Sequence, residues 1–259
     1  ILPNVDQYAV FDSIFFTDMP ESNAIYSLPY ELTQKYQIQR YGEHGISHSY
    51  LAERTAELLN RPLNELKIIT LHLGSGASVA AIKDGKAFDS SMGFTPLTGL
   101  TMGTRAGDVD PAIVPFLMEK EGMTAEEVMT LLNDRSGLLG ISESSSDMRD
   151  IEAAWQEGDR QASLAREIFI NRGVKYVGAY FAELGGIDAL VLAGGIGEHQ
   201  IDLRLALLKQ LRVLGIEVDE KLNQANQEGI ISPKDAQIKT MLIPTNEELQ
   251  MVRQIKKEI

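Results

Sequence analysis

The stretch "IITLHLGSGASVAAIKDGKAFDSS", from Ile68 to Ser91, decides the fold. An apolar run passes through a glycine-rich turn, Gly74–Gly76, into a second run, and Asp84 with Gly85 separates the second run from a third. Apolar runs bounded by turn residues are typical of β-strands, and an Asp-Gly pair is typical of a two-residue hairpin turn. The stretch therefore predicts three consecutive antiparallel strands, at 67–73, 78–82 and 86–90.

The remaining chain alternates apolar runs with helical patterns. Further strands are predicted at 8–12, 189–193 and 239–243. Helical spacing of apolar residues predicts helices at 47–60, 124–134, 160–186 and from 246 onward. Tight hairpins join antiparallel strands and helical crossovers join parallel ones, so we expect an α/β chain with a mixed sheet.

Helix ends carry their own signals. Thr124 and Glu127 have the spacing of a capping box, and so do Thr245 and Glu248. Gly185 and the glycine after it follow the long helical pattern as a C-cap would.

Composition excludes several classes of partner. The chain has 24 Lys+Arg against 37 Asp+Glu, a net charge of −13 that repels nucleic acid and anionic membranes. It contains no cysteine, which excludes disulfides and thiolate metal sites. It also contains no run of about 18 apolar residues and no signal-peptide pattern. We therefore expect a cytoplasmic protein that binds neither nucleic acid nor membrane.

The Gly74–Gly76 turn has two interpretations. It is either an ordinary hairpin turn or an anion site, because glycines permit positive φ and let a ligand approach the backbone. His72 at the strand end and the hydroxyls of Ser75 and Ser78 favour the anion site.

Three more segments are candidates for binding or catalysis. The run "ALVLAGGIGEH" is a buried-looking strand that enters a glycine-rich helix start, a geometry suited to a nucleotide. Arg105 lies among glycines and suits a bidentate phosphoryl contact, or else forms a salt bridge with Asp108. His44 and His48 have the spacing of a metal pair, although no third ligand is evident.

Taken in order, these segments resemble a known family. The motifs "VFDS", "RYGEHGISH", "HLGSGAS", "SSMGFTPLTGLTMGTRAGDVDPA", "SGLLGIS", "SSDMRD", "GGIGEH" and "IPTNEEL" closely resemble the acetate kinase (acetate/propionate kinase) family over residues 9–249. The resemblance implies an RNase H-like lobe of the actin, hexokinase and heat-shock ATPase type, in which a strand, turn and strand hold ATP phosphates. It implies reversible phosphoryl transfer from ATP to acetate or another short-chain carboxylate, giving ADP and an acyl phosphate.

The resemblance also assigns site residues. It implies catalytic roles for Asp12, His44 and Arg105, and binding of Mg²⁺ or Mn²⁺ by Glu247. It implies nucleotide binding by His72, Leu73, Gly74, Ser75, Gly76, Asp147, Met148, Arg149, Gly195, Ile196, Gly197, Glu198 and His199. The sequence departs from the family pattern at Phe16, Glu43, Ile46, Ser75, Ala106 and His199.

The family's amino-terminal lobe has no counterpart in this sequence, which begins with Ile1. We expect residues 1–15 to be the end of that lobe, 16–245 to form the carboxy-terminal nucleotide-binding lobe, and 246–259 to be a helix that packs back toward the first lobe. We also expect a homodimer or pairing with an amino-terminal lobe. The alternative is a truncated, non-catalytic lobe that binds nucleotide or a partner. A sugar kinase or actin-like ATPase fits the motifs less well.

Overall fold

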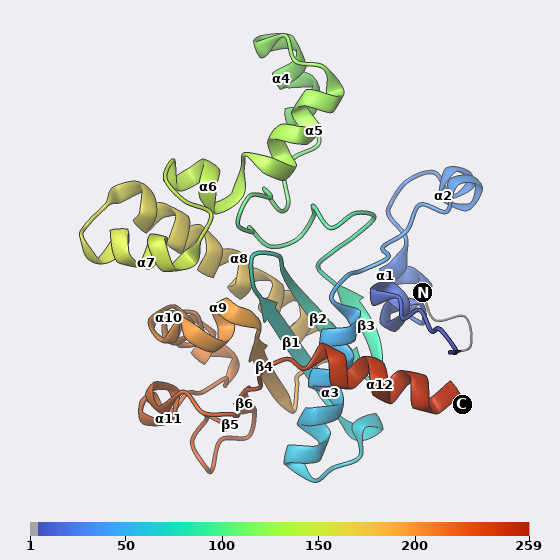
Figure 1. Ribbon diagram of the computed structural model, residues 1–259, viewed down its shortest axis with the longest axis vertical. Coiled ribbons are helices and arrows are strands. Elements are labelled where there is room, and N and C mark those ends of the chain that lie inside the picture. The colour runs from blue at the N-terminus through green and yellow to red at the C-terminus, as the bar shows by residue number, and fades with distance from the viewer. Residues whose placement is uncertain (1–4, 259) are drawn as a thin grey trace.

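A mixed sheet forms the centre of the computed structural model, which describes residues 5–258 (Figure 1). Within these residues the sheet has six strands in the order β3-β2-β1-β4-β6-β5. The strands are β1 (Lys67–Leu73), β2 (Ala77–Lys83), β3 (Lys86–Ser90), β4 (Ala189–Ala193), β5 (Gly229–Ile230) and β6 (Lys239–Leu242). Strands β1, β4 and β6 are parallel, whereas β2, β3 and β5 are antiparallel to their neighbours. The predicted mixed sheet is confirmed.

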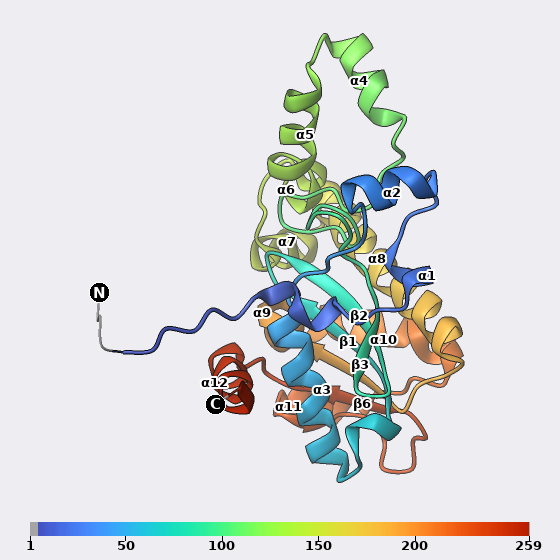
Figure 2. The same cartoon turned by 90° about the vertical axis from the view of Figure 1, so that its right-hand side faces the viewer.

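Helices cover both faces of this sheet. Figure 2 shows α3 and α12 on one side of the strands and α8 and α10 on the other. The helices of the described part are α1 (Glu21–Ala24), α2 (Tyr30–Tyr36), α3 (Gly45–Leu59), α4 (Ile113–Glu121), α5 (Ala125–Asp134), α6 (Gly137–Ser142), α7 (Met148–Gln156), α8 (Arg160–Leu184), α9 (Gly194–His199), α10 (Ile201–Leu211), α11 (Glu220–Ala225) and α12 (Glu247–Glu258), with 3₁₀ turns η1 (Asp12–Phe16), η2 (Leu63–Glu65) and η3 (Arg212–Leu214). No helix within residues 5–258 is long and apolar enough to cross a membrane.

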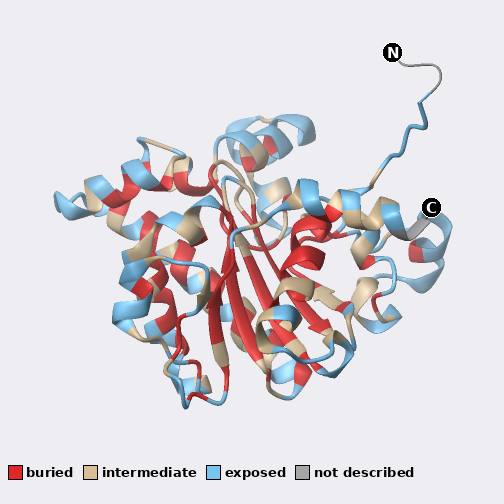
Figure 3. Cartoon of the chain, turned by 60° about the horizontal axis from the view of Figure 1, so that its bottom comes forward, coloured by how far each residue is buried: buried red, intermediate tan, exposed pale blue. Residues whose placement is uncertain are grey.

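Strands β1, β2, β4 and β6 are buried on both faces (Figure 3). Ile69 and Leu71 of β1 belong to the same core as Phe169 of α8. Ile68 packs on the opposite face with Leu51 of α3. Side chains alternate along a strand, so Thr70 shares the face of Ile68. Strand β1 therefore presents a polar residue to α3 within an otherwise apolar run.

Most of the predicted turns and helix caps are confirmed. Asp84 and Gly85 have φ of 54° and 77°, as a type I′ hairpin turn between β2 and β3 requires. The capping box of Thr124 and Glu127 is present at the start of α5. Gly185 ends α8 with φ of 64°. These features depend on residues close in sequence, which explains why the sequence alone predicts them.

The predicted strand at 8–12 is wrong. The chain over 5–11 has no regular structure, and η1 begins at Asp12. Tyr8 and Phe11 are 50% and 68% exposed. An apolar run forms a strand only where another strand can accept its backbone hydrogen bonds, and these residues pair with none in the described part of the chain. Residues 1–4 of the predicted first segment lie outside the described residues.

The predicted capping box at Thr245 and Glu248 is also wrong. The side chain of Asn246 accepts the hydrogen bond from the backbone N–H of Leu249 at 3.0 Å and so caps α12. The hydroxyl of Thr245 instead contacts Ser47 on α3 at 2.9 Å. A tertiary contact has displaced the local one.

The glycine loops that follow β1 and β4 differ in whether their backbone needs a positive φ. Gly74 and Gly76 do not have positive φ, contrary to our expectation. Gly194, at the end of β4, has φ of +76°, and a Cβ there would lie 2.7 Å from the carbonyl oxygen of Leu73. Strand β1 and the start of α9 can approach this closely because residue 194 has no side chain.

We expect Gly194→Ala to lower the free energy of unfolding by about 2 kcal/mol or more, because it adds both positive-φ strain and a clash with the backbone of Leu73. Gly195→Ala is the matched control, since a Cβ on Gly195 would meet nothing within 4 Å. Urea unfolding of both variants checks this, and equal stabilities would contradict it.

Candidate active site

The loop between β1 and β2 separates two groups of functional residues. Gly74 and Ser75 line a cavity of about 330 Å³. Gly76 faces the other group: a Cβ on it would lie 3.3 Å from Nε2 of His44 and 3.8 Å from Nη1 of Arg105. The structure thus brings the predicted phosphate loop against two of the predicted catalytic residues. Glycine at position 76 leaves room for the ring of His44, which a side chain there would crowd.

Asp12 holds the start of α3. Its carboxylate accepts hydrogen bonds from the backbone N–H groups of His44 (2.6 Å) and Ile46 (3.0 Å). The first N–H groups of a helix have no partner within the helix and carry partial positive charge, so a carboxylate is stabilised there. His44 itself has φ of 58°. Asp12 therefore orients the backbone that carries His44.

Three of the histidines form a cluster with hydroxyl groups. Nδ1 of His44 and Nε2 of His48 both lie 2.8 Å from Oγ of Ser78. The ring of His72 stacks on that of His44 with centroids 4.3 Å apart. The remaining polar contacts of this cluster are Nδ1 of His48 with Oγ1 of Thr70 at 2.7 Å, Nδ1 of His72 with Oγ of Ser47 at 2.8 Å, and Oγ1 of Thr245 with Oγ of Ser47 at 2.9 Å.

The interpretation of His44 and His48 as a metal pair is wrong. Each points a nitrogen at the same serine oxygen, and both nitrogens of His48 are engaged by hydroxyls. The residues that the structure describes contain no group of three His, Cys, Asp or Glu side chains arranged to hold a metal ion.

Burial keeps these imidazoles neutral. Desolvation lowers the pKa of His44, and the charge of Arg105 lowers it further while Asp12 opposes the shift. Burial also lowers the pKa of His48 well below its ordinary value. The pKa of His72 falls to about 3, because of burial first and the neighbouring His44 second. The cluster therefore offers N–H donors and lone pairs at neutral pH, but no added positive charge.

Arg105 supplies the positive charge. Its Nη1 lies 3.4 Å from the carbonyl oxygen of Pro96 and 3.7 Å from Sδ of Met102. The predicted alternative, a salt bridge with Asp108, is wrong, because that carboxylate accepts from Tyr176 at 2.6 Å. None of the ion pairs in the described part of the chain uses Arg105. Its guanidinium is available to an anion beside His44.

The carboxyl groups of Glu43 and Glu247 lie close enough to Asp12 to respond to its charge. Burial raises the pKa of Glu43, as do the charge of Asp12 and a side-chain hydrogen bond with it, while Arg105 opposes the shift. Burial and the charges of Asp12 and Glu248 raise the pKa of Glu247. Like charges held together favour binding of a cation or a proton.

The 330 Å³ cavity brings most of the predicted nucleotide-binding residues together. Asp147 caps α7 by accepting from the backbone N–H of Arg149 at 2.8 Å, and its side-chain hydrogen bond with Arg149 lowers the pKa of Asp147 to about 2. The cavity is lined by Gly74, Ser75, Ser146, Asp147, Met148, Arg149, Gly195, Ile196, His199 and Gln200.

Three predicted nucleotide-binding residues lie behind the cavity wall. Leu73 is 1% exposed and belongs to the core, and Gly197 is buried beside it. Oε1 of Glu198 accepts from the backbone N–H of Gly194 at 3.0 Å and of Thr245 at 3.4 Å. Glu198 therefore joins the start of α9 to the chain just before α12 and Glu247.

Sequence reasoning missed several residues of the site. Ser146 and Gln200 line the cavity beside predicted residues. Ser47, Thr70 and Thr245 were missed because their partners are distant in sequence. One signal was present: polar residues at 70 and 72 alternate with apolar ones in β1.

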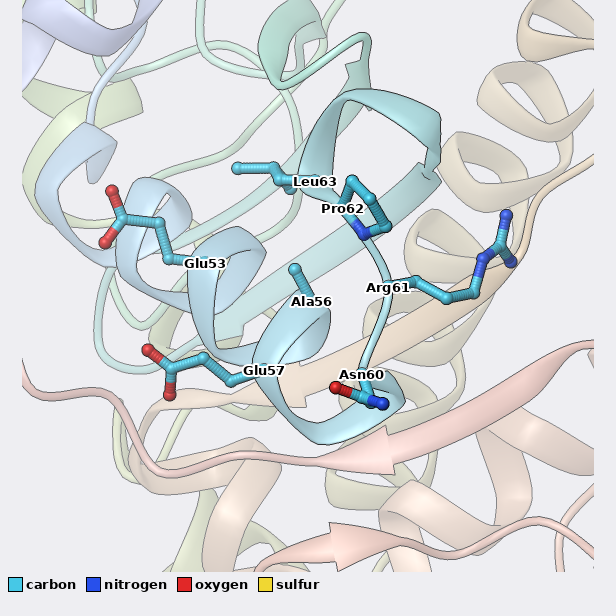
Figure 4. A pocket seen from close by; sticks show the side chains of 7 residues that line it. All are labelled: Glu53, Ala56, Glu57, Asn60, Arg61, Pro62 and Leu63. Atoms are coloured by element: carbon cyan, nitrogen blue, oxygen red, sulfur yellow. The ribbon is translucent and has the colours of Figure 1, made fainter.

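A larger groove, of about 590 Å³, lies at the far end of α3 (Figure 4). Its charged side chains are engaged by neighbours: Arg253 contacts Glu53 at 3.4 Å and Glu57 at 3.2 Å, and Arg61 pairs with Asp188 at 2.6 Å. Figure 4 shows Glu53 and Glu57 extending away from Arg61. No predicted site residue lines this groove, so the smaller cavity is the candidate site.

The sequence matches a protein-family model and curated relatives. The model of the Acetokinase family matches residues 1–253. The acetate kinases of Limosilactobacillus fermentum and Bacillus subtilis are 52% and 50% identical to this chain over 99% and 98% of it. The chain spans 65% of the length of each of these two curated relatives.

Solved structures give the same result. The acetate kinase of Porphyromonas gingivalis matches with a TM-score of 0.93 and 44% identity, over 96% of this chain and 63% of that one. A propionate kinase from Francisella tularensis matches with a TM-score of 0.88 and 42% identity, over 93% of this chain and 62% of that one. The predicted fold class, the actin, hexokinase and heat-shock ATPase type, is confirmed.

The lowered pKa of His72 predicts acid-sensitive stability. In the unfolded chain His72 is protonated below about pH 6.5, whereas in the folded chain it stays neutral down to about pH 3. The free energy of unfolding therefore falls as the pH falls through this window. One such group contributes a slope of up to about 1.4 kcal/mol per pH unit. We expect His72→Gln to reduce the slope, measured by urea unfolding at several pH values. His199→Gln, at an exposed histidine, is the control. An unchanged slope in His72→Gln would overturn this expectation.

Proposed function

The chain belongs to the acetokinase family, and from this premise we propose that it transfers the terminal phosphoryl group of ATP to a short-chain carboxylate such as acetate, forming ADP and an acyl phosphate. The observation that supports this proposal most directly is the position of the β1–β2 loop. One end of the loop lines the nucleotide-sized cavity, and Gly76 faces His44 and Arg105. A nucleotide in the cavity with its phosphates along the loop directs its terminal phosphate toward these two residues.

The reaction moves a phosphoryl group between two oxygens. An oxygen of the carboxylate attacks the γ-phosphorus, and the bond from that phosphorus to the β,γ-bridging oxygen breaks, so that ADP leaves with the electron pair. Charge is spread over three equatorial oxygens in the transition state, and fixed donors stabilise it without covalent chemistry. Arg105 supplies a guanidinium that forms none of the ion pairs in the described chain, and His44 supplies an N–H group beside it.

The donor set at Glu247 suits a magnesium ion. Mg²⁺ is usually held by one or two carboxylates together with substrate phosphates, so a site with no complete protein cage fits it. Burial and the charges of Asp12 and Glu248 raise the pKa of Glu247, as a cation-binding position among carboxylates requires. When bound, the ion neutralises charge on the phosphate oxygens. Glu247 would hold it, and Glu198 supports the start of α12 on which Glu247 lies.

The division of the chain into lobes also belongs to this proposal. Residues 16–245 contain the sheet and every residue that lines the cavity. Helix α12 packs on α3 through Arg253, which contacts Glu53 and Glu57. The homodimer and the pairing with an amino-terminal lobe stay predictions.

Nucleotide binding is the first test. Isothermal titration of the chain with Mg·ADP is expected to give one site. Arg149→Ala is expected to weaken binding about tenfold, the loss of one charge-assisted hydrogen bond. Arg160→Ala, an exposed arginine outside the cavity, removes the same charge and is expected to leave the affinity unchanged. No binding by the folded chain at millimolar nucleotide would contradict the proposal.

Phosphoryl transfer is the second test. Acyl phosphate formation is measured for the chain alone and with the part of the Limosilactobacillus fermentum relative that the chain does not cover. Arg105→Ala is expected to lower turnover by about 100-fold or more. Its affinity for Mg·ADP is expected to stay unchanged, because Arg105 does not line the cavity. Near-normal turnover in Arg105→Ala would exclude a role for this residue in the transition state.

A further inference from the structure

A single hydroxyl lies between two imidazoles of the site. Oγ of Ser78 is 2.8 Å from Nδ1 of His44 and 2.8 Å from Nε2 of His48. A serine hydroxyl has one proton, so it can donate to one of these nitrogens and must accept from the other. The positions of the ring protons on His44 and His48 are therefore coupled.

Thr70 determines the direction of this coupling. Its Oγ1 lies 2.7 Å from Nδ1 of His48, and this is its one hydrogen bond within the described chain. Thr70, His48 and Ser78 are all 0% exposed, so bulk water does not reach them. If His48 donated to Thr70, the threonine proton would be buried without an acceptor, at a cost of about 1–3 kcal/mol. Thr70 therefore donates to Nδ1 of His48.

The remaining protons follow from that first donation. A neutral His48 that accepts at Nδ1 carries its proton on Nε2 and donates it to Ser78. Ser78 then donates to Nδ1 of His44, so the ring proton of a neutral His44 lies on Nε2. That nitrogen is the one beside Gly76 and Arg105.

We propose that Thr70, His48 and Ser78 form a relay of hydrogen bonds that fixes His44 in its Nε2-protonated tautomer. The three are positioning residues, because they act on the reacting group through His44. The inference rests on the proposed function only for what the Nε2–H group contacts, namely an oxygen of the transferring phosphoryl group. The opposite tautomer would present a lone pair to that oxygen and repel it.

The neighbouring histidine shows why burial matters to this argument. His72 contacts Ser47, which contacts Thr245, so it too is joined to a chain of two hydroxyls. Thr245 is only partly buried, so water can accept its proton and neither direction is excluded. Of the two chains of hydroxyls, only the buried one ending at Thr70 dictates a tautomer.

The tautomer can be read directly by nitrogen NMR. The chain contains four histidines, so ¹⁵N-histidine labelling gives a small set of ring signals that His44→Gln, His72→Gln and His199→Gln assign. Protonated and unprotonated ring nitrogens have well-separated shifts. We expect the parent chain, without substrate, to show His44 protonated at Nε2 and not at Nδ1.

Removing the hydroxyl of Thr70 should allow His44 to adopt both tautomers. In Thr70→Val, His48 loses the proton that fixes its Nδ1 as an acceptor, so we expect His44 to become a mixture of both forms. Thr70→Ser keeps the hydroxyl and should restore the parent spectrum. Thr240→Val is the matched control, because Thr240 is a 0% exposed strand threonine that donates to the carbonyl of Glu217. Ser78→Ala tests the same prediction should Thr70→Val fail to fold.

Kinetics give the second readout. We expect Thr70→Val to lower turnover about tenfold or more with an unchanged KM for nucleotide, because tautomer control acts on the transition state. An Nδ1-protonated His44 in the parent chain, or a tautomer unchanged in both Thr70→Val and Ser78→Ala, would overturn the relay. The NMR result needs no catalysis, so an intact relay without transfer activity, even when the uncovered part of the relative is added, would contradict the proposed function alone.

Discussion

Burial of hydroxyl and imidazole groups between α3 and the central strands is the constraint on which the arrangement of this site depends. An unpartnered buried polar group costs about 1–3 kcal/mol, so those on β1 and β2 must meet partners on α3. Thr70 and Ser78 meet this requirement with His48 at 2.7 and 2.8 Å. Helix α3 therefore has one position on the sheet, and that position places His44, just before the helix, beside Gly76.

Charged groups around the start of α3 determine which ligands the site favours. Asp12 binds the N–H groups at the start of α3 and repels the carboxyl groups of Glu43 and Glu247. Arg105 and the neutral His44 lie next to these carboxylates. An anion that carries a cation, such as a magnesium-bound phosphate, satisfies both halves of such a site, whereas a free anion or a free cation satisfies only one.

Chemical surroundings, and not size, distinguish the candidate cavity from the larger groove at the end of α3. The larger groove has its charges engaged in ion pairs with Arg253 and Asp188. The smaller cavity shares the loop Gly74–Gly76 with Arg105 and the ring of His44, and none of the ion pairs in the described chain uses Arg105. A preorganised guanidinium that is not engaged in an ion pair suits a phosphoryl group.

The sequence by itself determined the features that near neighbours control: the Asp84-Gly85 turn, the cap of Thr124 with Glu127, most strands, the family and the candidates Arg105 and His44. It could not show that residues 8–12 pair with no strand among residues 5–258, or that Thr245 would hydrogen-bond with Ser47 and not cap α12. Asp12 meets His44 across 32 residues, and Thr70 meets His48 across 22. Only the tertiary structure decided these contacts, because the partner of a buried polar group is set by packing between distant elements and not by the residues beside it in the chain.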